Sequence, residues 1–229
     1  MRHAQPEWVR EGLTIVDPPL TELGHRQAAA LARAMAGEAL DEVLVSPLLR
    51  ARQTAAPVLA TLGRSDDVEL WLEEIRDPKW HGTPAERAAE AYRELRDRAP
   101  ADRWRGLTGG EDIREFVDRI HLGAEKFLQE RGVHRLDVEL PVWHIADPGR
   151  RIALIAHAGT NTIVICHLLG LEPTPWEWDR FVIGHGSVSR IESMEMGDGH
   201  TFCLSALADD EFLTKEEQSE VRTRAAEDF

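Results

Sequence analysis

The chain has 229 residues, of which 42% are hydrophobic and 30% are charged, and its formal net charge is −14. This length suits one globular domain with a sizeable core, so we predict a single domain over residues 1–229. The negative charge argues against nucleic acid as a partner, because the phosphate backbone requires clustered Lys and Arg. A phosphorylated substrate gains no long-range steering from such a molecule, so any attraction must be local.

Neither of the two cysteines, Cys166 and Cys203, lies in a CxxC metal motif, and two alone make no disulfide framework. They fit reduced thiols in a cytosol. No apolar run approaches roughly 18 residues, and the N-terminus has no apolar stretch of the signal-peptide type. We therefore expect a cytoplasmic protein that does not span or bind a membrane.

The first helix is expected to follow a loop. Residues 9–19 are turn-rich and end in Pro18-Pro19, so they predict loop. Thr21 has the character of an N-cap, and the apolar residues after it have helical spacing. Gly37 suits the end of this helix.

A strand and a second helix are expected next. Residues 41–45 form a short apolar run that predicts a strand. Ser46 as N-cap and Pro47 at the first helical position then predict a helix that Gly63 ends. Residues 68–72 are another strand candidate.

Two helices are predicted in the middle of the chain. Residues 83–86, Thr-Pro-Ala-Glu, have the spacing of a capping box and open a polar helix as far as about Arg98. An apolar stripe of period 3.6 predicts a helix over residues 113–131. We expect residues 84–131 to form a small helical cap over one end of the sheet.

The last third of the chain has a mixed pattern, and residues 133–147 give no clear prediction. The remaining expectations are a strand at 151–156, a buried helix at 160–169, strand candidates at 181–183, 188–191 and 201–204, and a charged terminal helix from the capping box 214–217.

Strands that alternate with helices over most of the length predict an α/β fold. We expect a three-layer sandwich, in which helices cover both faces of a mostly parallel central sheet. Such sheets bind ligands outside the carboxyl ends of their strands.

Charged and imidazole side chains stand where several of these strands end. Arg2 and His3 open the chain, Arg50 lies in the first turn of a helix, His157 follows the strand 151–156, and Glu74 follows the candidate 68–72. Free N–H groups at a helix start and the guanidinium fork both suit phosphate oxygens. The strand ends would therefore deliver these residues to one anion site.

The same stretches resemble the motifs of the histidine phosphatase superfamily, the phosphoglycerate mutase-like proteins of the branch 1 type. The similar stretches follow the family's motif order from residue 2 to about residue 195, which is most of the chain. The matching stretches are Arg2-His3-Ala4, Pro19-Leu20-Thr21-Glu22-Leu23-Gly24, Ser46-Pro47-Leu48-Leu49-Arg50-Ala51 with Thr54-Ala55, Leu72-Glu73-Glu74 with Trp80-His81-Gly82, Gly109-Gly110-Glu111-Asp112, and Ala156-His157-Ala158-Gly159.

The resemblance implies a role for each residue. His3 would become a phosphohistidine, Arg2, Arg50 and His157 would bind the phosphoryl group, and Glu74 would protonate the leaving oxygen. Cations around His3 should keep its imidazole neutral and nucleophilic. Because these cations would stabilise the transferred group, we expect no metal and no other cofactor.

Two features depart from the family pattern. The family often has an asparagine six places after the histidine as a phosphate ligand, and Val9 stands there, so Gln5 is the candidate replacement. The family's first strand precedes Arg-His, whereas only Met1 does here, and we expect upstream residues to complete it. If the chain starts at Met1, a charged α-amino group with a pKa of roughly 8 in model peptides lies beside the site.

Three further positions allow two interpretations each. Neighbours in an extended segment face opposite sides, so only one of Glu73 and Glu74 can point inward, and we favour Glu74. Glu111 is either adjacent to the substrate or a favourable charge at a helix N-terminus. His185 either lines the site or is an ordinary turn residue.

The predicted function is hydrolysis of a small phosphorylated metabolite through a phosphohistidine on His3. Phosphoryl transfer of the phosphoglycerate mutase type is the first alternative. A non-catalytic protein that binds a phosphorylated ligand is the second. The sequence is compatible with a homodimer.

Overall fold

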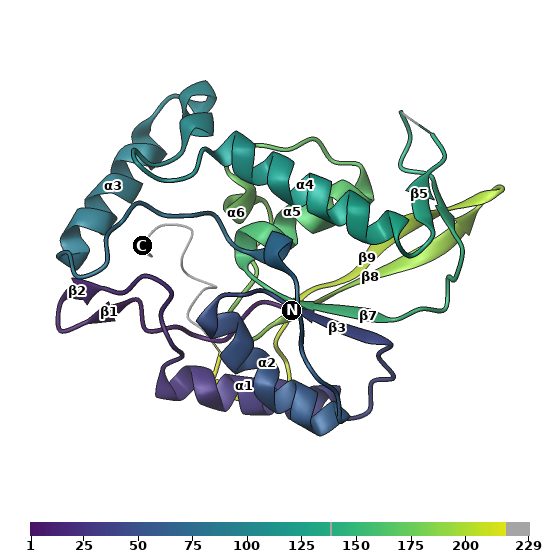
Figure 1. Ribbon diagram of the computed structural model, residues 1–229, viewed down its shortest axis with the longest axis horizontal. Coiled ribbons are helices and arrows are strands. Elements are labelled where there is room, and N and C mark those ends of the chain that lie inside the picture. The colour runs from purple at the N-terminus through teal and green to yellow at the C-terminus, as the bar shows by residue number, and fades with distance from the viewer. Residues whose placement is uncertain (138, 219–229) are drawn as a thin grey trace.

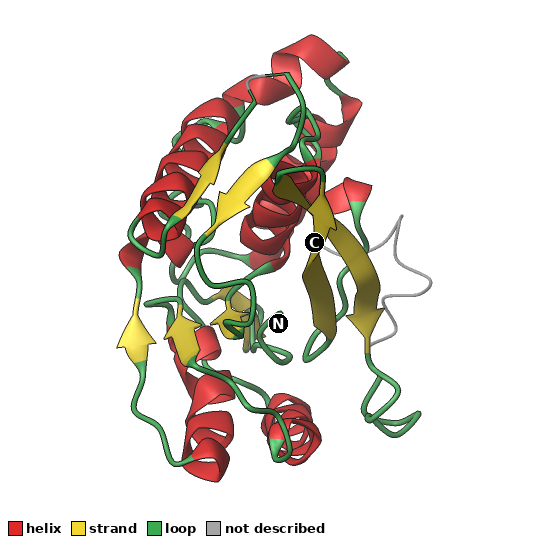
Figure 2. Cartoon of the chain, turned by 90° about the vertical axis from the view of Figure 1, so that its right-hand side faces the viewer, coloured by secondary structure: helices red, strands yellow, loops and turns green. Residues whose placement is uncertain are grey.

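The computed structural model describes residues 1–137 and 139–218. Its parallel strands lie between two groups of helices (Figure 1, Figure 2). The helices are α1 (Glu22–Met35), α2 (Leu49–Leu62), α3 (Ala85–Asp97), α4 (Ile113–Gln129), α5 (Ala158–Leu169) and α6 (Glu177–Arg180), with 3-10 helices η1 (Leu70–Leu72) and η2 (Pro100–Arg105). The strands are β1 (Val9–Arg10), β2 (Leu13–Thr14), β3 (Glu42–Val45), β4 (Asp67–Val68), β5 (Val133–Arg135), β6 (Trp143–Ile145), β7 (Ile152–Ile155), β8 (Val188–Met196) and β9 (Gly199–Asp209).

The start of the chain joins two larger sheets. Three parallel strands have the order β4-β3-β7, and four antiparallel strands have the order β5-β6-β9-β8. Arg2 forms a parallel bridge with Ala156, directly after β7. The Arg2 amide also donates to the carbonyl of Ser187, directly before β8, at 3.1 Å. The α/β prediction is confirmed, and the antiparallel sheet is an addition that the sequence patterns did not indicate.

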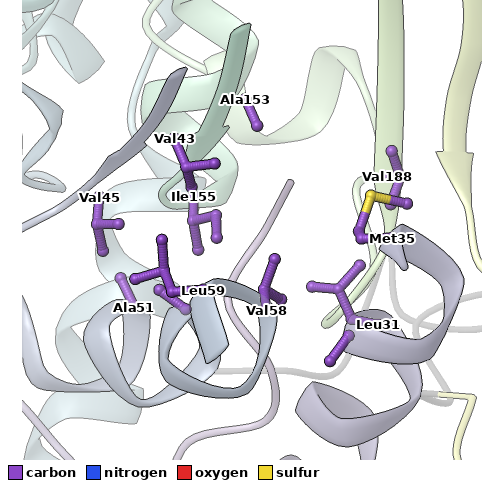
Figure 3. Close-up of a cluster of buried hydrophobic side chains, with 12 residues drawn as sticks. Leu31, Met35, Val43, Val45, Ala51, Val58, Leu59, Ala153, Ile155 and Val188 are labelled. Atoms are coloured by element: carbon purple, nitrogen blue, oxygen red, sulfur yellow. The ribbon is translucent and has the colours of Figure 1, made fainter. Parts of the chain in front are cut away.

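Helices cover both faces of the parallel strands. On one face α1 and α2 pack against β3 and β7, with Leu31 and Val58 facing Val43 and Ile155 (Figure 3). On the other face Phe127 of α4 packs near the opposite sides of these strands. Burying each large aliphatic side chain contributes about 1.5–3 kcal/mol, so this two-sided core fixes where the strands end. Among the described helices, none is long and apolar enough to cross a bilayer.

Helix α1 begins where the sequence predicted. The Thr21 hydroxyl accepts the Gly24 amide at 2.9 Å, which satisfies one of the free donors of the first turn. A side chain at position 24 could not fit, because a Cβ there would lie 2.2 Å from the carbonyl oxygen of Gln5. The glycine therefore lets α1 pack directly on the segment that follows His3.

Helix α2 begins two residues later than predicted, and Ser46 is not its N-cap. Leu48 takes the N-cap position without a side-chain hydrogen bond of its own. The carboxylate of Asp17, far away in sequence, accepts the Leu49 amide at 2.7 Å instead. The hydroxyl of Ser46 is used by a histidine of the site, as described below. Gly63 ends the helix in the left-handed conformation, as predicted.

Four other predictions were wrong in detail. Residues 9–19 are not loop throughout, because β1 and β2 pair there as an antiparallel hairpin. The Thr83 hydroxyl donates to the Trp80 carbonyl, so α3 starts after Pro84 without a capping box. Residues 68–72 are a strand only at their start, where β4 ends, and then form η1. Residues 181–183 form no strand, because the Ile183 carbonyl accepts the Arg2 guanidinium at 2.6 Å.

The predicted terminal helix lies mostly outside the described residues. Thr214 and Glu217 form the reciprocal hydrogen bonds of a capping box at 3.1 and 3.3 Å. The residues up to Gln218 form a turn.

The predicted cap segment contains two kinds of helix. α3 and η2 have no buried residue, and the start of α3 hydrogen-bonds the β1–β2 hairpin through Ala85 and Gly12 (Figure 1). In contrast, α4 contributes Phe116 and Ile120 to a core cluster with Ile163 of α5.

Candidate active site

The first three residues of the chain lie beside the carboxyl end of β7. The His3 amide donates to the Ala156 carbonyl at 2.9 Å, and the Ala156 amide donates to the Met1 carbonyl at 3.0 Å. The Asn161 side chain also donates to the Met1 carbonyl. His3 and His157 therefore stand side by side, with their ring centroids 5.0 Å apart.

His3 is buried and its ring is held by two contacts. Nδ1 lies 2.8 Å from the Ala4 carbonyl, and Nε2 accepts the Nε–H of Arg50 at 3.3 Å. Since a guanidinium can only donate, Nε2 must carry the lone pair and Nδ1 the proton. Burial, followed by the positive charges of Arg50 and the other cations, holds the pKa of His3 well below its usual range. The imidazole is therefore neutral, with its lone pair on Nε2.

Arg50 lies at the start of α2, as expected, and is 4% exposed. Its Nη1 lies 3.8 Å from Asp17, and its guanidinium stacks 4.8 Å from the Trp8 ring. Burial lowers the Arg50 pKa, and the charge of Glu74 is the largest effect that opposes this. The second arginine of the motif, Arg52, points to the surface and pairs with Asp66.

Arg2 is oriented by the turn that contains His185. One guanidinium nitrogen donates to Ile183, and Nη2 lies 2.8 Å from Nε2 of His185. Nε of Arg2 is buried without a hydrogen-bond partner in the described protein. Burial lowers the pKa of Arg2 to about 10, which leaves it positive at neutral pH. His185 therefore lies at the site, where it contacts Arg2 and approaches the His3 ring to 5.4 Å.

His157 immediately precedes α5 and is completely surrounded. Its Nε2 lies 2.7 Å from the hydroxyl of Ser46, while its Nδ1 is buried and has no partner in the described part of the protein. Burial and the charges of Arg50 and Arg2 hold the His157 pKa well below its usual range. When the Ser46 hydroxyl donates to Nε2, the ring proton lies on Nδ1, which can then donate to an anion beside His3.

Glu74 faces the site and Glu73 does not. The Glu74 carboxylate accepts the Gly159 amide at 2.9 Å and the Ile75 amide at 3.0 Å. Burial raises its pKa, although the two amides and the nearby arginines oppose that shift. Glu73 instead pairs with Arg76 at 2.7 Å. Gly159 is required here, because a Cβ would lie 2.7 Å from Glu74 Oε1.

Glu111 lies behind the site and not against the histidines. Its carboxylate binds Arg119 at 2.9 Å and the Arg76 amide at 3.0 Å. Arg119 in turn donates to the carbonyls of Glu73 and Glu74. Glu111 therefore holds the segment that carries Glu74, which is a positioning contact.

Gln5 is held at the start of α1. Its side-chain oxygen accepts the Thr21 hydroxyl at 2.8 Å, and its backbone amide donates to the side-chain oxygen of the buried Gln27 at 2.8 Å. The role of Gln5 as a phosphate donor stays a prediction. Val9, which stands at the family's asparagine position, is exposed on β1.

Acidic and aromatic residues surround the outer side of Arg50. Asp17 and Trp8 contact it directly, as given above. Asp77 accepts the hydroxyl of Tyr92, on α3, at 2.7 Å, and both groups act electrostatically on Arg50. The positive charge of Arg50 is therefore partly balanced by the carboxylates of Asp17 and Asp77.

Sequence reasoning missed several residues that hold the site. Thr54 accepts the Ala4 amide at 2.9 Å and donates to the Arg50 carbonyl at 2.7 Å, so it ties both motifs together. The sequence predicted Ser46 as a helix cap, but its hydroxyl contacts Nε2 of His157 instead. Thr54 and Ser46 both belong to the motif around Arg50, so that motif could have identified them as part of the site. Asp17 lies in a turn-rich stretch with no such signal.

A neutral histidine among buried cations at the strand ends of an α/β fold defines a site of the phosphoryl-transfer class. The chain belongs to the histidine phosphatase superfamily (branch 1), whose family model matches residues 1–202. The resemblance inferred from the motifs is thereby confirmed, and the chain is a phosphatase of this family.

Known relatives agree in name and in fold. Phosphoserine phosphatase 1 of Hydrogenobacter thermophilus is 27% identical over 175 residues, which cover 75% of each chain. Glucosyl-3-phosphoglycerate phosphatase of Mycolicibacterium vanbaalenii is 28% identical over 187 residues, covering 77% of this chain and 75% of the relative. The structure of the α-ribazole phosphatase from Shigella flexneri aligns with a TM-score of 0.67 at 21% identity, covering 91% and 94% of the two chains. This structural likeness confirms the fold.

Proposed function

We propose that the protein hydrolyses small phosphomonoesters through a phosphohistidine on His3. The observation that carries this proposal is that the buried His3 ring, with Nε2 unprotonated, lies among fixed side chains that can donate hydrogen bonds. Those donors are the guanidinium groups of Arg2 and Arg50 and the Nδ1 of His157. Charge that develops on the phosphoryl oxygens would meet these donors without reorganisation.

The first step transfers the phosphoryl group to the enzyme. Nε2 of His3 forms a bond to phosphorus, and the bond from phosphorus to the ester oxygen breaks. The leaving oxygen takes the proton of the Glu74 carboxyl group, which becomes a carboxylate. The raised pKa of Glu74 supports this role, because a general acid must hold its proton near the working pH.

The second step restores the enzyme. The Glu74 carboxylate removes a proton from water, the water oxygen bonds to phosphorus, and the P–N bond breaks with its electron pair returning to Nε2. The products are inorganic phosphate, neutral His3 and protonated Glu74. Over the two steps no charge is gained or lost by the enzyme, because His3 and Glu74 both return to their starting protonation states.

The surroundings of Arg50 favour hydrolysis over mutase-type transfer. A mutase must rebind a leaving group that carries further negative charge. Here Asp17 lies 3.8 Å from Arg50 and Asp77 also acts on it electrostatically, and these two carboxylates would repel such a group. We therefore propose esters whose leaving group has no net negative charge. Phosphoserine, the substrate named for one relative, is an example, because its leaving group, serine, carries an amine as well as a carboxylate.

The segment with α3 is proposed to act as a cap over the leaving group. Tyr92 supports this role, since it reaches from α3 to Asp77 near Arg50. The proposal assigns phosphate binding to the strand ends and selection of the leaving group to α3.

A screen of phosphorylated metabolites tests the function. Wild type, His3→Ala and the surface control His25→Ala are compared for release of inorganic phosphate, with isomerisation of phosphoglycerate measured in parallel. We expect wild type and His25→Ala to release phosphate from the same esters and His3→Ala to release none above background. Isomerisation faster than hydrolysis would replace the phosphatase with the mutase, and inert wild type would indicate a protein that only binds phosphorylated ligands.

A further inference from the structure

The turn between α6 and β8 is fastened to the segment that carries the catalytic histidine. The Gly186 amide donates to the His3 carbonyl at 3.1 Å, and the Arg2 amide donates to the Ser187 carbonyl at 3.1 Å. Gly186 has a φ of 72°, a left-handed conformation that favours glycine. The side chain of His185, which lies between these two anchors, therefore starts from a fixed backbone.

The same turn holds the guanidinium group of Arg2. Its Nη1 donates to the Ile183 carbonyl at 2.6 Å, and its Nη2 lies 2.8 Å from Nε2 of His185. A guanidinium group can only donate, so Nε2 of His185 must accept and the ring proton must lie on Nδ1. The Nε–H of Arg2 is in neither contact and is buried without a partner in the described part of the protein. The turn therefore orients the guanidinium group and leaves this donor for a ligand.

This contact exists only while His185 is neutral. A protonated imidazole has an N–H on both ring nitrogens and no acceptor. Nη2 of Arg2 and Nε2 of His185 would then be two donors with positive charges at 2.8 Å, which is a repulsive arrangement. Histidine is the side chain whose charge ordinarily changes between about pH 5 and pH 8. Mild acid can therefore break the hold on Arg2.

Positive charge predominates among the described groups that face His185. The start of the chain contributes Arg2 and His3, and the His3 ring lies 5.4 Å from the His185 ring. α1 and the segment after β9 reach the turn through Gln27 and Leu213, which do not titrate. The further groups whose charges act on Arg2 or His3 are those of Glu74, Arg50 and His157. Protonation of His185 would therefore add charge to a group that is already cationic.

The charged residues nearest to His185 in sequence are held by partners elsewhere. Arg180 of α6 pairs with Glu177 at 3.2 Å, and Arg190 of β8 pairs with Glu38 at 3.3 Å. Arg2 is therefore the partner through which a charge on His185 acts.

We propose that His185 positions Arg2 and thereby makes phosphoryl binding depend on pH. Neutral His185 accepts Nη2 and holds the guanidinium group with its Nε–H available to the phosphoryl oxygens, whereas protonated His185 releases it. This inference rests on the proposed role of Arg2 in binding the phosphoryl group. His185 is a positioning residue, because it acts through Arg2.

Two variants separate the charge of His185 from its shape. In His185→Gln the amide oxygen can still accept from Arg2 but does not titrate. His185→Lys carries a positive charge and can only donate. The control is His25→Gln, which changes an exposed histidine of α1.

The measurements are kcat/KM for one ester and the affinity for inorganic phosphate, between about pH 5 and pH 8. Each value is expressed as the ratio of wild type to variant. The ratio removes the titration of phosphate itself, which is common to both proteins. NMR of the wild-type His185 ring follows its protonation over the same range and needs no variant.

We expect the ratio for His185→Gln to fall about tenfold from pH 8 to pH 5 in both quantities, because wild type alone loses a hydrogen bond to a charged group. The fall should follow the NMR titration of His185. His185→Lys should bind phosphate about tenfold more weakly than wild type at pH 8. The ratio for His25→Gln should not change with pH.

A ratio for His185→Gln that is constant with pH would overturn the proposal, since His185 would then have only a structural role. A ratio that rises in acid would also overturn it, because protonated His185 would itself bind the phosphate. An NMR signal that stays neutral throughout would have the same consequence. A wild type that hydrolyses no ester would contradict the proposed function, while the phosphate-binding ratios would still decide the role of His185.

Discussion

The buried group of His3, Arg50 and His157 and the exposed helix α3 differ in what fixes them. Each member of the group is at most 4% exposed and lies at the end of a strand or the start of a helix. α3 has no buried residue, and its links to the rest include the β1–β2 hairpin, the Tyr92–Asp77 hydrogen bond and the ring contact between Tyr92 and Trp80. Under the proposed function, the chemistry common to all phosphate esters would use the rigid group, whereas selection of the leaving group would fall to the surface helix.

Substitution of Arg50 should give the largest loss in this comparison. We expect Arg50→Ala to lower kcat/KM by about 10³-fold, because a buried donor directed at the phosphoryl oxygens is removed. Arg52→Ala is the matched control from the same motif and should change kcat/KM by less than about twofold, since its ion pair is on the surface. Steady-state kinetics on one ester measures both. Similar losses in the two variants would remove Arg50 from the site.

Glu74→Gln should separate proton transfer from nucleophilic attack. On an alkyl phosphate we expect kcat to fall about 10²-fold, because the leaving oxygen is no longer protonated. 4-Nitrophenyl phosphate needs no such proton, so its pre-steady-state burst of nitrophenolate should be retained.

The neighbouring variant Glu73→Gln is the control for that experiment, since Glu73 pairs with Arg76 outside the site. It should leave both esters unaffected. Loss of the burst in Glu74→Gln would show that this carboxyl group acts before the leaving group departs.

Acid should destabilise the buried group and leave α3 largely unaffected. His3 and His157 have folded pKa values well below the ordinary 6.5. Their stabilising contribution is complete above pH 6.5 and is lost as the pH falls below it, because only the unfolded chain then takes up protons. Each histidine should reduce the free energy of unfolding by about 1.4 kcal/mol per pH unit in that window.

Urea titrations between pH 7 and pH 5 measure this slope. His3→Gln should show a slope that is lower than that of wild type by about 1.4 kcal/mol per pH unit, because one buried histidine is gone while His157 and His167 still contribute. Glu74 acts in the opposite direction: its raised pKa stabilises the folded state at low pH, and the gain is lost as the pH rises through its folded pKa. An unchanged slope in His3→Gln would mean that His3 is protonated in the folded protein.

Ser46→Ala tests how the rigid group is held. Removal of the hydroxyl leaves Nε2 of His157 buried without its 2.7 Å contact, which should lower stability by about 1–3 kcal/mol and kcat/KM by about tenfold. The exposed Ser65→Ala is the control and should change neither. Calorimetry and kinetics on both proteins decide whether the contact matters.

The smallest effect is expected from α3. Tyr92→Phe removes the hydrogen bond to Asp77 and should change KM by about threefold for sensitive esters, with kcat and Tm nearly unchanged. Glu94→Gln, on the same helix, is the control. A loss of kcat as large as that of Arg50→Ala would place Tyr92 in the chemical step and end the distinction between the two regions.

The sequence predicted the strand ends well because short motifs encode them. Arg2-His3, the Arg50 motif and His157 were all placed correctly relative to one another, since motif order and the geometry of parallel strands leave little freedom. Ser46 was misassigned because a serine before a proline fits a helix cap locally, while its partner, His157, lies 111 residues away. Local patterns cannot report such a contact.

The remaining features depend on contacts that have no local signature. Asp17 caps α2 from a turn-rich segment. A residue larger than glycine would not fit at position 159, because the side chains of Glu74 and Trp178 lie too close to it. The exposed α3 was predicted as a helix, but what its surface recognises is not encoded in periodicity or capping.

The central claim is that His3 accepts the phosphoryl group, and trapping of that intermediate tests it most directly. Wild type would be mixed with a substrate found in the screen, quenched in denaturant within milliseconds, kept alkaline to preserve the P–N bond, and digested for mass spectrometry. The account predicts a phosphoryl group on the peptide that contains His3 in wild type and none in His3→Ala. A phosphoryl group on another residue, or steady turnover with no adduct at any time point, would contradict it.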